Sequence, residues 1–197
     1  MTWLSPLVAQ RCANQAAAWL DDPNSVVMDF ETTGLDGYAV EVAITDMNGE
    51  ELLSRRVNPG RVRVAARGGG LDDWVPITMH PKAEAVHGIR LDDLRDCPLF
   101  MDLVELDVLH GVNVVAYNAP FDRSVWLRET YRWRQDEDRM ALDSPPEPKE
   151  WRCAMRLYSE WVGGRDAPWM KLPGGDHTAL GDCRATVAVL RRVAGRT

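Results

Sequence analysis

The spacing of apolar and polar positions predicts a helix followed by three strands in the first third of the chain. Residues 5–20 have the amphipathic spacing of a helix, with a Ser-Pro start and an Asp-Asp-Pro-Asn stop at 21–24. A short β-branched run at 25–31 indicates a buried strand, and positions 39–46 alternate like a second strand. An Asn-Gly turn then returns the chain over 50–57, so we expect an antiparallel meander.

The remainder of the chain predicts one more strand among several helices. A β-branched run at 112–117 is a fourth strand that can join the first in parallel. Residues 58–76 are rich in Pro, Gly and Arg, which favours a long loop or surface insertion. Helical spacing covers 81–86, 99–109, 121–134, 151–162 and 179–194. We therefore expect a single α/β domain over residues 1–197, built as a mixed sheet with helices on both faces.

The composition is typical of a folded domain, and the net charge argues against one class of nucleic-acid-binding protein. The hydrophobic share is 45% and the charged share 27%, both close to the globular average. The formal net charge of −7 argues against a protein that coats duplex nucleic acid by bulk charge. It does not exclude a nuclease that handles a strand end, since metal ions neutralise acidic pockets.

Cysteine usage and hydropathy predict the cellular compartment. The four cysteines lie far apart, without the short spacings of a zinc site or the density of a disulfide framework (Cys12, Cys97, Cys153 and Cys183). No apolar run approaches the ~18 residues of a membrane span, and the first residues lack a signal-peptide layout. We expect a cytoplasmic protein with reduced thiols and no membrane contact.

Two carboxylates end the first predicted strand. Alternation along a strand turns Asp29 and Glu31 to one face and Phe30 to the other. Neighbouring buried carboxylates repel each other, and a hard divalent cation such as Mg²⁺ relieves both the repulsion and the desolvation. The plain alternative is a pair of solvated acids at a fraying strand end.

Two more segments carry acids at helix starts. Asp122 follows the fourth strand in the first turn of a predicted helix, where an acid is also favoured by the helix dipole alone. His177 precedes the last helix, and Asp182 lies about one turn inside it, so both can face one pocket. A lone histidine is more commonly a surface or core residue than a catalyst. Each segment by itself is weak or moderate evidence for an active site, and only the combination of the three is specific.

The three segments together resemble a known family. Asp-Phe-Glu-Thr-Thr-Gly-Leu at 29–35, Asn-Ala-Pro-Phe-Asp at 118–122 and His-Thr-Ala-Leu-Gly-Asp at 177–182 look like the exonuclease motifs of the DnaQ-like (DEDDh) 3′→5′ exonucleases. The stretch Ala-Val-His-Gly-Ile at 85–89 is similar to a further conserved stretch of that family. The resemblance covers most of the chain and implies a ribonuclease-H-like fold.

The resemblance implies a role for each matching residue. Two divalent metal ions, Mg²⁺ or Mn²⁺, would be held by four acids, and His177 would be the general base (metal and catalytic residues Asp29, Glu31, Asp122 and Asp182, with His177). The terminal nucleotide would contact a second set of residues (Thr32, Thr33, Gly34, Leu35, Asn118 and Phe121). His87 in the Val-His-Gly-Ile stretch is expected to stabilise a helix end.

Basic residues accompany two of these regions. Five arginines and no acid occur between Arg55 and Arg67, and four arginines follow the second motif (Arg123, Arg128, Arg132 and Arg134). They can bind the phosphates of a single strand, although charge runs more often mark solvated faces.

The leading hypothesis is a metal-dependent 3′→5′ exonuclease that releases nucleoside monophosphates from single-stranded DNA 3′ ends. Proofreading and DNA repair are the roles that the family suggests. One alternative is an exoribonuclease on short RNA, which no residue here separates from a DNA enzyme. Another is a non-catalytic nucleic-acid or polymerase-docking module of the same fold. The expected partner is a single-stranded nucleic acid 3′ end, and a polymerase partner or a homodimer stays open.

Overall fold

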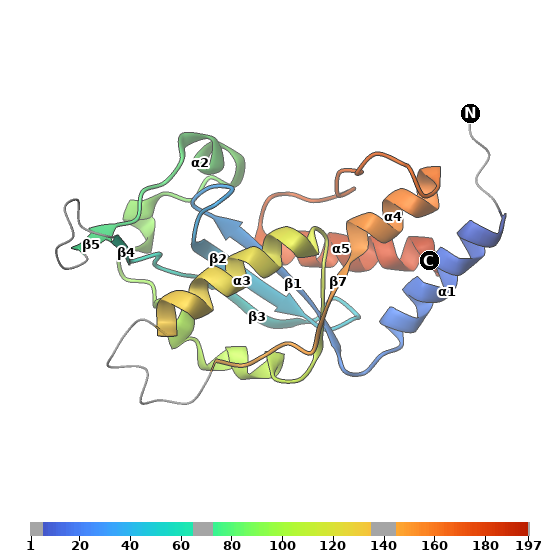
Figure 1. Cartoon of the computed structure of the whole chain (residues 1–197), viewed down its shortest axis with the longest axis horizontal. Coiled ribbons are helices and arrows are strands. Elements are labelled where there is room, and N and C mark those ends of the chain that lie inside the picture. The colour runs from blue at the N-terminus through green and yellow to red at the C-terminus, as the bar shows by residue number, and fades with distance from the viewer. Residues whose placement is uncertain (1–5, 65–72, 135–144, 197) are drawn as a thin grey trace.

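The computed structural model describes residues 6–64, 73–134 and 145–196. Its centre is a five-stranded sheet in the order β3-β2-β1-β6-β7 (Figure 1). The strands of this sheet are β1 (Ser25–Thr32), β2 (Ala39–Thr45), β3 (Glu51–Arg56), β6 (Asn113–Ala116) and β7 (Glu150–Cys153). β2 runs antiparallel to β1 and β3, whereas β6 is parallel to β1 and β7 is parallel to β6. The predicted meander and its parallel fourth strand are confirmed.

Helices cover both faces of the sheet. One face packs against α1 (Pro6–Leu20), α4 (Ala154–Gly163) and α5 (Ala179–Val193). The other face packs against α3 (Ala119–Arg134) and the short 3₁₀ turns η2 (Phe100–Asp102) and η3 (Val104–Leu109). Figure 1 shows the two layers, with α3 in front of the sheet and α5 behind it. The expected mixed α/β sheet with helices on both faces is confirmed.

Alternation along β1 divides its side chains between the two layers. Val27 belongs to the core that α5 covers, whereas Met28 and Phe30 belong to the core on the α3 side. Since side chains alternate along a strand, Asp29 and Glu31 share the face of Val27. The acids of β1 therefore point toward the layer that carries α5.

Two predicted helices differ in the structure. The helix expected over 151–162 is preceded by β7, whose short segment pairs with β6 and gains its strand character from that tertiary contact. The segment 99–109 forms 3₁₀ turns instead of an α-helix. Its buried apolar residues recur every third position (Phe100, Leu103, Leu106 and Leu109), which is the period of a 3₁₀ helix.

The segment 58–76 is not the plain loop that its composition suggests. It contains a two-stranded antiparallel hairpin of β4 (Arg61–Val64) and β5 (Asp73–Pro76), separate from the main sheet. The part of this segment at 65–72, with its Gly-rich run, lies outside the described residues. Strands of four residues are too short to produce a clear periodic signal, so the prediction missed them.

The hairpin leads into a short helix that the sequence predicted correctly. This helix, α2 (Pro81–His87), is followed by the 3₁₀ turn η1 (Leu91–Leu94). His80 caps the start of α2 by accepting a hydrogen bond from the Lys82 N–H at 3.1 Å. Gly88 ends it with φ of 72°, in the left-handed region that favours glycine. Among the described residues, every helix is too short or too polar to cross a membrane.

Candidate active site

The end of β1 places two carboxylates against the start of α5. Glu31 is 9% exposed and Asp29 is half-buried. An oxygen of Glu31, an oxygen of Asp182 and a ring nitrogen of His177 all lie within 4.8 Å of one another. The sheet and the last helix thus bring together residues that are about 150 positions apart in the chain.

The turn before α5 carries the histidine. Asp182 Oδ1 accepts backbone hydrogen bonds from Asp176 at 2.9 Å and from His177 at 3.3 Å. Thr178 caps the helix by accepting from the Gly181 N–H at 3.1 Å. His177 itself has φ of 61°, and no other non-glycine residue in the described ranges has a positive φ. Such backbone strain at a polar turn is common where a side chain must be aimed at a functional site.

Asp122 reaches the same region from the first turn of α3. The carbonyl of Asn118 accepts backbone hydrogen bonds from Phe121 at 2.8 Å and from Asp122 at 3.3 Å, which starts the helix. The Asp122 side chain is 1% exposed, and its Oδ1 has no hydrogen-bond partner within the described part of the chain. A buried carboxylate oxygen without a partner is costly unless it binds a proton or a cation.

The acids perturb one another strongly. Burial, followed by the charges of Asp182 and Glu41, raises the pKa of Glu31 to about 8. Burial, with the Asp182 charge adding to it, raises the pKa of Asp122 to about 8. Burial and the charge of Asp122 hold the pKa of Asp29 well above its usual range. Such mutual repulsion shows that the carboxylates share one electrostatic site.

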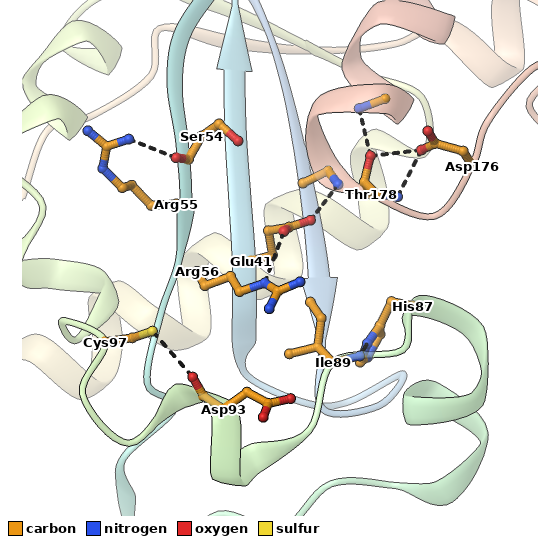
Figure 2. Close-up of polar contacts among 12 residues, drawn as sticks. Glu41, Ser54, Arg55, Arg56, His87, Ile89, Asp93, Cys97, Asp176 and Thr178 are labelled. Carbon is orange, nitrogen blue, oxygen red and sulfur yellow. Dashed lines mark hydrogen bonds and ion pairs between the residues drawn. The ribbon is translucent and has the colours of Figure 1, made fainter.

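A fifth acid, Glu41, supports this site and was not singled out from the sequence. It lies opposite Glu31 in the register of β1 and β2. One oxygen of Glu41 accepts the backbone N–H of Ala179 at 2.8 Å, and the other faces the Arg56 guanidinium at 3.7 Å (Figure 2). Glu41 therefore links β2 to the first residue of α5. The signal in the sequence that could have identified Glu41 is the alternation of β2, which turns Glu41 to the same face as its cross-strand partner.

A cavity of about 920 Å³ opens beside Glu31. Its walls include five of the six residues expected to contact the terminal nucleotide (Thr32, Thr33, Gly34, Leu35 and Phe121). Leu35 is 85% exposed, so its side chain is available to a ligand. Asn118 is not among the lining residues, and its carbonyl serves the start of α3 instead. The expected contact of the Asn118 side chain with the terminal nucleotide stays a prediction.

His87 has the structural role that the sequence predicted. The Ile89 N–H donates to its Nδ1 at 3.0 Å, so Nε2 carries the proton and donates to the carbonyl of Thr32 at 3.1 Å. Burial lowers the pKa of His87, which favours this neutral form. His87 thereby joins the end of α2 to the strand end that carries Glu31.

Several of the arginines proposed to bind phosphate are engaged within the protein. Arg55 pairs with Glu105 at 3.1 Å, and Arg128 donates to the carbonyl of Gly37 at 2.9 Å. Arg132 pairs with the buried Glu129. These three side chains stabilise the fold, in line with the alternative that charge runs usually have structural or solvated roles. Arg67 lies outside the described residues.

The donor set suits a divalent cation. It consists of carboxylate oxygens with one imidazole at the edge, and hard cations such as Mg²⁺ and Mn²⁺ prefer oxygen ligands. The partnerless Oδ1 of Asp122 and the raised pKa of Glu31 both indicate that, among the described residues, no group stabilises the charged form of these carboxylates. The residues present therefore fit a bound metal ion.

Comparison with known proteins agrees with this chemistry. No protein-family model matches the chain. An uncharacterised exonuclease of Escherichia phage 186 is 27% identical over 92% of this chain and 93% of its own length. The DNA polymerase III subunit epsilon of Salmonella typhimurium is 32% identical over 49% of this chain, which spans only 39% of that subunit.

A solved structure extends the comparison to the fold. Exonuclease X in complex with 5′-overhanging duplex DNA has a TM-score of 0.53 and 26% sequence identity, covering 88% of this chain and 94% of that one. In sequence and in fold the chain is similar to the DnaQ-like exonucleases. It is an enzyme, a 3′→5′ exonuclease that hydrolyses phosphodiester bonds. A non-catalytic module of the same fold is thereby not supported.

Proposed function

We propose that this enzyme releases nucleoside monophosphates from the 3′ end of single-stranded DNA by two-metal-ion hydrolysis. The observation that carries the proposal is that acids from β1 and α5 lie together beside a cavity of about 920 Å³, with Asp122 of α3 close enough to shift the pKa of Asp29. DNA is favoured over RNA because the polymerase subunit and the exonuclease X complex are both DNA proteins by name.

The four acids of the three motifs are the proposed metal ligands (Asp29, Glu31, Asp122 and Asp182). Two Mg²⁺ or Mn²⁺ ions bound there would stabilise the charge that develops on the attacking and departing oxygens. The protein's part is to hold the carboxylates in place before substrate arrives, and the backbone hydrogen bonds to Asp182 contribute to that.

His177 is the proposed general base. Its ring nitrogen lies within 4.8 Å of oxygens of Glu31 and Asp182, at the exposed edge of the cluster. A histidine in its neutral form can accept the proton of the attacking water at that edge. Its place beside the acids fits a proton acceptor that acts next to the metal ligands.

The terminal nucleotide is proposed to bind in the cavity beside Glu31. Thr32 and Thr33 are buried at the strand end, and the exposed Leu35 can contact the last base. This placement puts a free 3′ end next to the acids, so the enzyme should act only at strand ends. A polymerase partner and a homodimer stay predictions, and nothing in the site requires either.

The experiment that tests the proposal is degradation of matched oligonucleotides. Labelled DNA and RNA strands of one sequence, each with a free or a 3′-phosphorylated end, are incubated with Mg²⁺, with Mn²⁺ or with excess chelator. We expect DNA with a free 3′ end to shorten by single nucleotides, and only with metal present. A duplex with a recessed 3′ end provides a comparison substrate.

Three results would contradict the proposal. Full activity in excess chelator would exclude the metal mechanism, and efficient cutting of a closed single-stranded circle would show an endonuclease. Faster degradation of RNA than of DNA would show that the exoribonuclease alternative is correct.

A further inference from the structure

The β4–β5 hairpin forms one wall of the cavity that opens at the acids. Val62 and Val75 lie directly opposite each other in the hairpin register, and both line the cavity. They are joined there by Pro76 and Ile77 at the end of the hairpin. The loop after β1 also lines the cavity, with Thr33 and Leu35.

The two faces of the hairpin differ in character. Trp74, one position from Val75, lies opposite Arg63, whose guanidinium lies 6.0 Å from the centre of the Trp74 ring. Arg61 and Trp74 line a separate cavity of about 350 Å³. Since side chains alternate along a strand, the valines form the inner face and the aromatic and basic residues form the outer face.

The base of the hairpin is fixed to the body of the enzyme. The Ile77 N–H donates to the carbonyl of Gly60 at 3.1 Å, and the Gly60 N–H donates to Asn58 Oδ1 at 2.8 Å. The Arg132 guanidinium on α3 donates to the carbonyl of Pro59. These contacts hold the hairpin as a defined wall next to the acids.

The shape and lining of the cavity indicate what it binds. Its volume of about 920 Å³ is near the top of the ~300–1,000 Å³ range of ligand pockets, so it has room beyond the terminal nucleotide. Its inner surface is largely apolar, whereas Lys82 and His80 lie at its polar side. Unpaired bases bury apolar faces while their phosphates stay near cations, which matches this arrangement.

We propose that the inner face of the β4–β5 hairpin, formed by Val62 and Val75, is a substrate-binding surface for the base of the nucleotide next to the 3′-terminal one. Glu31, one of the four proposed ligands, lines the same cavity, so a strand whose end lies at Glu31 can extend along this wall. The inference rests on the proposed exonuclease function and adds the element that determines affinity for unpaired strands.

The test uses a conservative double substitution, Val62→Thr with Val75→Thr. Threonine keeps the β-branched shape and strand preference of valine but replaces one methyl group by a hydroxyl. Burial of a methylene-sized group corresponds to about a fourfold change in affinity, so two such changes predict about a 16-fold rise in KM for a normal DNA strand. We expect kcat to change by less than about twofold, because neither valine is near the reacting atoms in the proposed mechanism.

A modified substrate separates base contact from other effects. In this DNA the nucleotide next to the 3′-terminal one lacks its base. We expect the native enzyme to show a raised KM on it, and the double variant to add little further. The matched control is Val104→Thr, the same chemical change at a 79% exposed position on η3, away from the cavity. Thermal unfolding of all three proteins checks that the hairpin variant is folded.

The outcomes distinguish the hairpin inference from the proposed function. If the native enzyme shortens no strand with Mg²⁺ or Mn²⁺, the proposed function is wrong. If the native enzyme is active but the hairpin variant matches Val104→Thr, the wall binds something other than the substrate strand and the inference is overturned. An equal rise in KM on both substrates also overturns it, because the contact would then not be with the base.

Discussion

At the scale of single residues, the site is defined by carboxylates that are held close against their own repulsion. Asp122 is the extreme case, with a 1% exposed side chain and a pKa raised to about 8 by burial. Burying such a carboxyl group raises the free energy of the folded state. A fold keeps it only where a bound ligand offsets that free energy or where the group has a function. Because Asp182 is fixed by two backbone N–H groups, the cluster cannot relax by turning that side chain away.

The residue whose role is most directly testable is His177. We expect His177→Ala to lower kcat by about 10²–10⁴-fold, the range for loss of a positioned general base. The fall in rate on the acid side of the pH profile should also change, because that limb reports protonation of the base. Folding should be nearly unaffected because the side chain is exposed, and metal affinity should change little because the four acids, and not His177, are the proposed ligands.

The control for His177 is His110→Ala, at an exposed histidine after η3. Steady-state rates from pH 5 to 9 and calorimetric Mn²⁺ titration give the two readouts. Near-normal turnover by His177→Ala at neutral pH would show that the histidine is structural.

At the scale of elements, α3 connects the start of β2 to the base of the β4–β5 hairpin. Glu129 is fully buried and accepts the Ala39 N–H at 2.9 Å. Its partner Arg132 also donates to the carbonyl of Pro59 and lies 4.8 Å from the Tyr38 ring centre. One buried ion pair thus connects α3, the start of β2 and the base of the hairpin.

We expect Arg132→Met to lower the free energy of unfolding by about 3–5 kcal/mol, because it leaves the Glu129 carboxylate buried without its counterion. Adding Glu129→Gln should recover much of that loss, since Gln keeps an acceptor for Ala39 without a charge. Urea unfolding of the single and double variants measures both effects. A loss below about 1 kcal/mol for Arg132→Met would show that solvent screens this pair as it does surface pairs.

At the scale of the whole molecule, the acid cluster couples stability to pH and to metal. The folded-state pKa values of Glu31 and Asp122, about 8, lie above their ordinary values near 4. For such groups the stability contribution is complete below pH ~4 and is lost as the pH rises toward ~8. We expect the metal-free enzyme to lose stability across this range.

Removing one carboxylate charge from the cluster should weaken the dependence of stability on pH. We expect Asp29→Asn to raise the metal-free stability at pH 8 by about 1–3 kcal/mol while abolishing turnover, because it relieves repulsion but removes a proposed ligand. Saturating Mg²⁺ should stabilise the native enzyme more than the variant. Thermal unfolding between pH 5 and 8, with Asp107→Asn on η3 as the exposed control, measures each effect. If the stability of Asp29→Asn depended on pH as strongly as that of the native enzyme, this account of the cluster would be wrong.

The elements that the sequence predicted well are those with long or locally complete signals. The meander, the parallel fourth strand, α1, α2, α3 and α5 each have clear periodicity, caps or turns within the segment itself. The prediction missed β7, the 3₁₀ turns and the hairpin, since their conformations depend on pairing partners or on segments too short to show a period.

The sequence by itself determined where the candidate catalytic residues lie along the chain, because the acids and His177 occur in ordered motifs at the ends of predictable elements. Only the tertiary structure decided the surroundings of that chemistry. Glu41 reaches α5 through strand register, Arg132 turns inward to a buried partner, and a hairpin lines the cavity beside Glu31. Those contacts join residues far apart in the chain, and local patterns of apolar and polar positions cannot specify which distant surfaces will meet.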